Sequence, residues 1–203
     1  FWANENPIED FVASTDSVIR SIFDFPCKQY IYISSPDVYN NHAEPKYTKE
    51  DTQIDPGKLD AYGLHKYLAE LVVKKYKERF LILRCSQILG SRLKKGAIYD
   101  AINGNDLFIT LRSKLQLITA FAIAEVIDVL LKKFVRDEVI NVGGVGTFSF
   151  TKLEEIIKRK LQVLPEAKLQ KYEMNTAKLQ HLYPSLKSSQ QYLQDFITDH
   201  LKH

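Results

Sequence analysis

Residues 30–39 read Tyr-Ile-Tyr-Ile-Ser-Ser-Pro-Asp-Val-Tyr. The first four are aromatic or β-branched, and a Ser-Ser-Pro turn follows them, which is typical of a buried strand. The apolar runs Phe80–Leu83 and Val139–Val142 predict two more strands of the same kind. No internal repeat or low-complexity tract interrupts the chain.

The segments between these strands carry helical spacing. Apolar residues recur every three or four positions in 7–24 and in 60–79, where Asp60 is placed to cap the second helix. Further helices are predicted at 95–103, at 120–134, and at 151–161, the last opened by a capping box of Thr151 and Glu154. Strands that alternate with helices predict an α/β fold with a parallel sheet.

Composition excludes several classes of protein. The net charge of +3 is too small to indicate nucleic-acid binding, and no apolar run reaches the ~20 residues that span a membrane. Two cysteines, Cys27 and Cys85, make no disulfide framework and favour a reducing, cytoplasmic location. His200 and His203 have no third ligand nearby in sequence, so we predict no metal site.

Tyr62 and Lys66 are the residues whose spacing indicates chemistry. They lie one helical turn apart, so both face the same side of the predicted helix. A phenol has an ordinary pKa of about 10, and we expect the neighbouring ammonium to lower that of Tyr62. A serine hydroxyl from Ser34-Ser35 would then hold a carbonyl or alcohol beside the phenol. The three groups predict a proton-transfer site for a C–OH group.

Five stretches, taken in order, resemble the extended short-chain dehydrogenase/reductases, also called NAD-dependent epimerase/dehydratases. The resemblance covers roughly residues 7–197, and the order of the signals makes it more specific than Tyr-x-x-x-Lys alone. The stretches are Tyr30–Tyr39 (strand, then Ser-Ser-x-x-Val-Tyr), Thr48–Asp51 with Pro56, Tyr62–Lys66 (Tyr-Gly-x-x-Lys), Leu81–Gly90 and Ile140–Gly144 (Asn-Val-Gly-Gly).

The resemblance implies a role for each site residue. Tyr62 would be the catalytic acid/base, Lys66 would tune it and bind the nicotinamide ribose of NAD or NADP, and Ser35 would orient the substrate oxygen. Asp37 stands where members place a second acid/base, although it is equally typical of a surface turn. Gln87 stands where many members have a substrate-contacting Asn, but a structural role is the more common one. Ser34 is a weaker candidate for cofactor contact. The implied substrate is a nucleotide sugar or a related small molecule.

Two departures from the family pattern limit these expectations. Pro36-Asp37 replaces the Asp-Glu pair of the 4,6-dehydratases, and proline cannot donate a proton, so that chemistry is disfavoured. The family's Gly-x-x-Gly-x-x-Gly stretch, which holds the pyrophosphate, is absent before Tyr30. We therefore expect a fragment whose first strand has an uncovered edge. The glycines Gly143, Gly144 and Gly146 imitate a phosphate loop but lack its Lys-Ser/Thr.

The predicted organisation is a truncated Rossmann-like part over residues 1–90 and a mainly substrate-binding lobe over 91–203, with a returning strand at about 138–143. The family implies an oxidoreductase or isomerase that forms a homodimer through helices 7–24 and 60–79. Two alternatives stay open: a non-catalytic binding or regulatory protein that keeps the fold, and a structural fragment that folds only with a missing half. Substrate identity and the choice of NAD over NADP are not predictable from this stretch.

Overall fold

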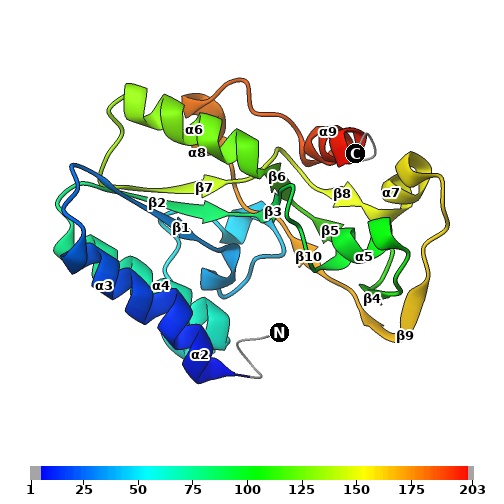
Figure 1. The fold of residues 1–203 in the computed structure, drawn as a ribbon, viewed down its shortest axis with the longest axis horizontal. Helices are drawn as coiled ribbons and strands as arrows, with labels where there is room; N and C mark the ends of the chain where they lie inside the picture. Colours follow the sequence, from blue (N-terminus) through cyan, green and yellow to red (C-terminus); the bar gives the residue numbers. More distant parts are fainter. Residues whose placement is uncertain (1–5, 201–203) are drawn as a thin grey trace.

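A computed structural model describes residues 6–200, and a parallel three-stranded sheet forms its centre (Figure 1). The sheet has the order β1-β2-β7, with β1 at Tyr30–Ser34, β2 at Phe80–Cys85 and β7 at Glu138–Val142. Helices α3 (Ser17–Asp24) and α4 (Ala61–Tyr76) cover one face, and α6 (Ala120–Lys132) and α8 (Ala177–Leu182) cover the other. The predicted α/β fold and its three strands are confirmed.

Strand β2 is the middle strand and has side chains buried on both faces. Leu81 and Leu83 pack with Val126 and Leu130 of α6, while Ile82 packs with Val73 on the α4 side. Successive side chains of a strand point to opposite faces, so an unbroken apolar run is what a strand covered on both sides requires. Strand β1 pairs only with β2 among the described residues, which leaves its other edge uncovered, as the sequence predicted.

The predicted helix at 7–24 is continuous but not uniform. It consists of α2 (Pro7–Phe11), a π-helical turn at Val12–Asp16, and α3. Thr15 Oγ1 of the π turn donates to the carbonyl oxygen of His65 at 2.9 Å, and His65 Nδ1 lies 2.6 Å from Asp10 Oδ2. His65 therefore joins the N-terminal helix to α4.

Two helix termini were predicted with different success. Asp60 caps α4 as expected, because its Oδ1 accepts from the main-chain N of Gly63 at 2.7 Å. The prediction that Thr151 and Glu154 form a capping box was wrong. Helix α7 (Phe150–Ile157) begins one residue earlier, and Glu154 Oε1 instead accepts from the main-chain N of Leu161 at 2.9 Å, beyond the C-terminus of the helix.

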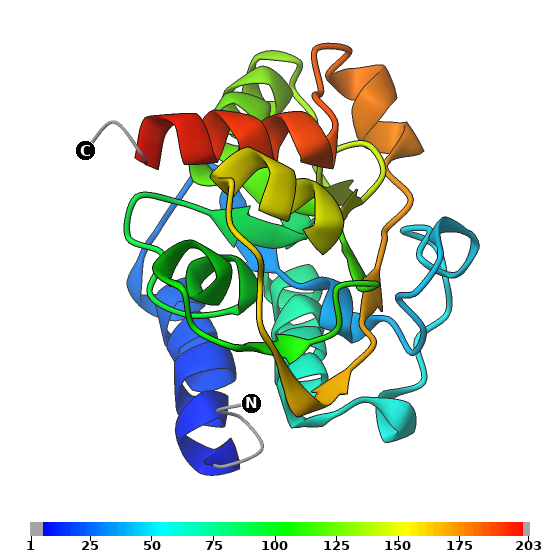
Figure 2. The same ribbon diagram turned by 90° about the vertical axis from the view of Figure 1, so that its right-hand side faces the viewer.

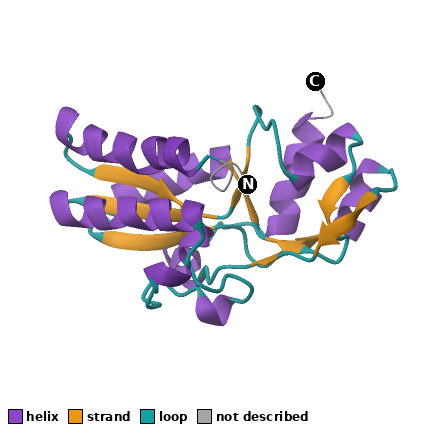
Figure 3. Cartoon of the chain, turned by 90° about the horizontal axis from the view of Figure 1, so that it is seen from below, coloured by secondary structure: helices purple, strands orange, loops and turns teal. Residues whose placement is uncertain are grey.

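A smaller lobe with its own core lies beside the sheet (Figures 2 and 3). Phe148, Phe150, Leu107, Leu117 and Leu193 are among its buried residues. The strands of this lobe are mostly two or three residues long. Three elements from the second half of the chain, α6, β7 and α8, belong instead to the central sheet and its covering helices. The remaining elements are β3 (Gln87–Leu89) with β6 (Leu117–Thr119), β5 (Lys114–Leu115) between β8 (Phe148–Ser149) and β10 (Lys171–Tyr172), β4 (Leu107–Ile109) with β9 (Val163–Lys168), α5 (Ala97–Asn103) and α9 (Ser189–His200).

Gly143 packs against the side chains of Gln116 and Ser86, and Gly144 packs against protein backbone. A Cβ at Gly144 would lie 2.6 Å from the main-chain N of Ser189 and 2.7 Å from the carbonyl oxygen of Leu117. The main-chain N of Gly144 donates to that same oxygen at 2.8 Å. Gly144 therefore has a steric role, because it lets three segments of the chain approach closely.

Candidate active site

A cavity of about 630 Å³ lies at the carboxyl ends of β1 and β2, where parallel sheets usually bind ligands. The smaller lobe supplies its opposite wall with Gln116, Tyr172, Glu173 and Met174. All six residues predicted for the site line this cavity: Ser34, Ser35, Asp37, Tyr62, Lys66 and Gln87.

Ser35 and Asp37 follow the carboxyl end of β1 and line the cavity. Ser35 caps a short 3₁₀ turn, Pro36–Val38, and its Oγ accepts from the main-chain N of Asp37 at 3.3 Å. The same hydroxyl donates to Asp37 Oδ2 at 2.6 Å. Both side chains are thereby fixed beside each other, within reach of a bound substrate.

Tyr62 lies on the first turn of α4, next to Ser35. Burial raises the pKa of its phenol to about 12, the charge of Asp37 acts in the same direction, and a hydrogen bond with Ser35 opposes them. The expectation that Lys66 lowers this pKa was wrong. Lys66 Nζ lies 5.9 Å from the centre of the Tyr62 ring and donates elsewhere, whereas Asp37, whose effect the sequence did not reveal, opposes ionisation.

Lys66 projects from α4 to the end of β1. Its Nζ donates to the carbonyl oxygen of Ile33 at 3.1 Å and lies 5.1 Å from the centre of the Tyr32 ring. Burial lowers the pKa of Lys66. An ammonium has three protons to donate, and the one hydrogen bond to Ile33 leaves capacity for a ligand in the cavity.

Gly63 explains how α4 can approach the end of β1 so closely. A Cβ at this position would lie 2.2 Å from the carbonyl oxygen of Asp37, much closer than real side-chain atoms come to backbone. The glycine after Tyr62 therefore has a steric role: it lets the start of the helix rest on the 3₁₀ turn that carries Ser35 and Asp37.

Ser34 lines the cavity but uses its hydroxyl in the core. Its Oγ donates to Glu70 Oε1 at 2.6 Å, and Glu70 accepts two hydrogen bonds from Arg84, at 2.9 and 2.7 Å. The Arg84 guanidinium also stacks on Tyr39, 4.7 Å from the ring centre. Glu70 lies one helical turn beyond Lys66 on α4, and its hydrogen bonds join α4 to β1 and β2. The hydrogen bond of the Ser34 hydroxyl is therefore a structural contact.

The polar loop at 40–58 is held by buried hydrogen bonds. Asn141 Oδ1 accepts from the Tyr39 hydroxyl at 2.9 Å, and its Nδ2 donates to the carbonyl oxygen of Thr48 at 2.6 Å. Glu50 Oε1 accepts from the main-chain N of Asn141 at 3.0 Å. The sequence motifs at 48–51 and 140–144 therefore contact each other.

Tyr172 and His42 belong to no pattern that predicts a site residue. Their rings stack with centres 3.9 Å apart and planes 15° apart, and Tyr172 reaches the cavity from the two-residue strand β10. Burial and the nearby Asp37 carboxylate raise the pKa of the Tyr172 hydroxyl. No local motif marks this contact, because the two residues lie on different lobes.

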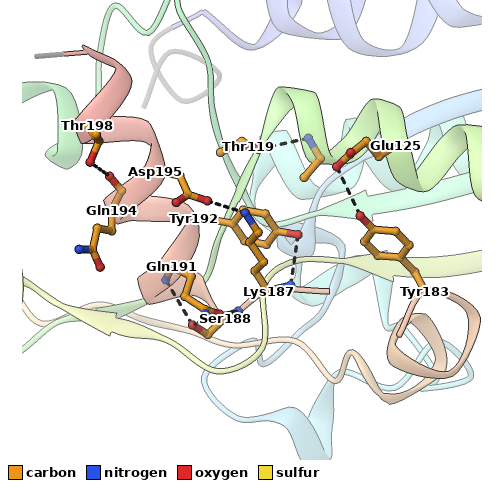
Figure 4. Close-up of polar contacts among 11 residues, drawn as sticks. Thr119, Glu125, Tyr183, Lys187, Ser188, Gln191, Tyr192, Gln194, Asp195 and Thr198 are labelled. Atoms are coloured by element: carbon orange, nitrogen blue, oxygen red, sulfur yellow. Dashed lines mark hydrogen bonds and ion pairs between the residues drawn. The ribbon is translucent and has the colours of Figure 1, made fainter. Parts of the chain in front are cut away.

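A second cavity, of about 1300 Å³, lies between the start of α6 and α9 and contains none of the predicted residues. Several of its polar groups bind one another: Lys187 Nζ lies 2.8 Å from Asp195 Oδ2, and the Tyr183 hydroxyl donates to Glu125 Oε2 at 3.3 Å (Figure 4). These pairs leave the first cavity as the better candidate for chemistry, although it is the smaller.

The part of the chain that the structure describes contains neither a metal-ligand cluster nor a membrane-spanning helix. No group of three or more potential metal ligands occurs between residues 6 and 200. In the same part of the chain, every helix is too short or too polar to cross a bilayer.

Comparison with known proteins gives the family. No curated protein matches the chain. Among solved structures, UDP-N-acetylglucosamine 4-epimerase from Methanobrevibacter ruminantium, in complex with UDP-N-acetylmuramic acid, is similar at TM-score 0.77 and 16% identity, over 98% of this chain and 72% of that one.

RMD from Pseudomonas aeruginosa, complexed with NADPH, has TM-score 0.77 and 17% identity, over 99% of this chain and 77% of that one. The dTDP-glucose 4,6-dehydratase from Bacillus anthracis, in complex with NAD, has TM-score 0.73 and 17% identity, over 98% and 70%. At these identities the structures show a shared fold. The family model for the NAD-dependent epimerase/dehydratase family matches residues 2–143, which is more than half of the sequence. The chain belongs to the NAD-dependent epimerase/dehydratase family.

Proposed function

We propose that this chain carries the catalytic and substrate-binding part of an NAD(P)-dependent enzyme that acts on a C–OH group of a nucleotide sugar. The observation that carries the proposal is the convergence of Ser35, Tyr62 and Lys66 in one cavity. Similar folds that bind UDP-sugars, NAD or NADPH support the ligand classes. Pro36 disfavours the 4,6-dehydratase reaction within this class.

The residues present fit the nicotinamide end of the cofactor. The spare protons of Lys66 and the phenol of Tyr62 suit ribose hydroxyls, and they lie at the carboxyl end of the sheet. When bound, the nicotinamide supplies or accepts a hydride. The chain itself would move the hydroxyl proton at the phenolic oxygen of Tyr62, while the Ser35 hydroxyl holds the reacting oxygen in place.

A homodimer through α2, α3 and α4 is part of the proposal. These helices expose an apolar surface that includes Ile8 (76% exposed) and Phe23 (61% exposed). Large exposed apolar patches often mark interfaces. The further exposed members are Phe11, Val12, Leu71 and Tyr76. Light scattering should give a dimer, and Phe23→Glu should give a monomer; a monodisperse wild-type monomer would rule the dimer out.

The experiment for the catalytic proposal is calorimetric titration. NADH, NADPH and UDP-glucose are titrated separately into the natural protein that contains this sequence, and into its Lys66→Met variant. Nicotinamide binding that weakens in the variant supports the proposal. Failure of the wild type to bind any of the three favours a non-catalytic protein that kept the fold.

A further inference from the structure

The smaller lobe gives the cavity a wall that includes Tyr172, Glu173 and Met174. This wall lies outside the central sheet, yet all six main-chain polar groups of residues 173–175 have hydrogen-bond partners. Buried main-chain groups require such partners, and here most of them are side chains from other parts of the chain. The position of the wall is therefore set by residues outside it.

Gln116 holds the wall from the side of the smaller lobe. Its Oε1 accepts from the main-chain N of Met174 at 3.0 Å, and its Nε2 donates to the carbonyl oxygen of Met174 at 3.3 Å and to that of Gly144 at 2.8 Å. Gln116 directly follows β5, which pairs with β10 at the start of the wall. These contacts join the wall to the smaller lobe.

Thr48 holds the same wall from the side of the central sheet. Its Oγ1 accepts from the main-chain N of Asn175 at 2.9 Å and donates to the carbonyl oxygen of Glu173 at 3.2 Å, which is closer than that of Pro45 at 3.4 Å. The carbonyl oxygen of Thr48 accepts from Asn141 Nδ2 of β7 at 2.6 Å. Thr48 is completely buried. One residue thus connects the wall of the smaller lobe to a strand of the central sheet.

His42 adds a second contact from the same loop. Its carbonyl oxygen accepts from the main-chain N of Glu173 at 2.9 Å, and its ring stacks on that of Tyr172 with centres 3.9 Å apart. The loop at 40–58 therefore holds the wall near both ends, through His42 at Tyr172 and through Thr48 at Asn175.

We infer that Thr48 is a positioning residue for the nucleotide sugar, because it fixes the distance between the wall at 172–174 and the turn that carries Ser35. The inference rests on the proposed function and states how that site is kept ready for its substrate. Thr48 is not among the described residues that line the cavity, so its effect on a ligand passes through the wall. Binding against a fixed wall avoids the free-energy cost of ordering it.

The test removes the hydroxyl of Thr48 and keeps the shape of the side chain. UDP-glucose and NADH are titrated separately, by calorimetry, into the natural protein that contains this sequence and into Thr48→Val and Thr48→Ser. We expect the Kd of UDP-glucose to rise by about 3- to 30-fold in Thr48→Val, as the ordering of one or two side chains on binding predicts. It should stay at the wild-type value in Thr48→Ser, which keeps the hydroxyl. The Kd of NADH should be the same in all three proteins, because Tyr62 and Lys66 lie on α4, outside the wall.

His42 offers a second, independent pair of variants. His42→Phe keeps a ring that can stack on Tyr172, whereas His42→Ala removes it. The hydrogen bond between the carbonyl oxygen of His42 and the main-chain N of Glu173 is kept in both, so the comparison isolates the stack. UDP-glucose should bind His42→Phe with the wild-type Kd and His42→Ala more weakly, with no change for NADH.

Amide hydrogen exchange gives a readout that needs no ligand. The amides of Met174 and Asn175 should exchange faster in Thr48→Val than in the wild type or in Thr48→Ser, while those of β2 stay equally protected. Equal exchange of the wall amides in the three proteins overturns the inference.

The titrations separate this inference from the proposed function. An unchanged affinity for UDP-glucose in Thr48→Val overturns the inference and leaves the proposed function standing. An equal loss of affinity for UDP-glucose and NADH would make Thr48 a general structural contact and also overturns it. A wild type that does not bind UDP-glucose removes the inference together with the proposed substrate class.

Discussion

Replacement of Gly63 by alanine should reduce the catalytic rate strongly and the stability of the fold only moderately. The new Cβ would begin 2.2 Å from the carbonyl oxygen of Asp37, and ordinary contact begins at 3.4 Å, so the start of α4 must move by about 1.2 Å. Tyr62 moves with it, away from Ser35. A displacement of about 1 Å can cost about 100-fold in rate, and we expect that loss in kcat.

The same change should affect stability only moderately. Overpacking costs about 1–3 kcal/mol, and alanine in a helix regains up to about 1 kcal/mol relative to glycine. The melting temperature should therefore fall by a few degrees, about 2–4 °C for each kcal/mol in a chain of this size. Turnover is followed by nicotinamide absorbance, and unfolding by circular dichroism.

Gly57→Ala is the control for this experiment. Its Cβ would lie 3.4 Å from the flexible side chain of Asp55, so no backbone has to move. We expect wild-type activity and stability for this variant. If Gly63→Ala behaves like Gly57→Ala in both assays, the steric argument for the Tyr-Gly pair is refuted.

Two further predictions concern buried groups. Glu70→Gln leaves the charge of Arg84 unpaired in the core and should lower the free energy of unfolding in urea by about 3–5 kcal/mol. The double variant E70L/R84M should recover most of that loss. Equal stability of the wild type, Glu70→Gln and the double variant would contradict the buried ion pair. The folded-state pKa of Tyr62 is raised to about 12 from an unfolded value near 10, so its contribution to stability is complete below about pH 10 and is lost as pH rises toward 12. Denaturation between pH 9 and 11 should show a smaller alkaline loss in Tyr62→Phe, and identical slopes would argue against burial of the phenol.

The sequence predicted the central sheet because its strands are buried on both faces. A continuous apolar run such as Phe80–Leu83 has few other stable placements. Strands of two or three residues, such as β5 and β10, have no such signal. Their pairing depends on the tertiary contacts that bring Lys114 and Lys171 together, and these contacts are not encoded locally.

The same contrast between local patterns and tertiary contacts applies to the site. Ser35, Tyr62 and Lys66 were predictable because each belongs to a local pattern beside a strand or on a helix. Tyr172 and His42 were missed because 130 positions separate them, and only folding stacks their rings. The pKa of Tyr62 was predicted in the wrong direction, since burial and the position of Asp37 outweigh a lysine whose ammonium is engaged with the backbone.

Hydride transfer by Tyr62→Phe tests the central claim most directly. The natural protein that contains this sequence is mixed with nicotinamide cofactor and a nucleotide sugar, UDP-glucose or a UDP-4-keto sugar, and the nicotinamide absorbance is followed. We expect turnover in the wild type and a loss of at least about 100-fold in the variant, the share that general acid–base catalysis supplies, with little change in melting temperature. Turnover that is the same in the variant and the wild type would contradict the assignment of Tyr62 as the proton-transfer group.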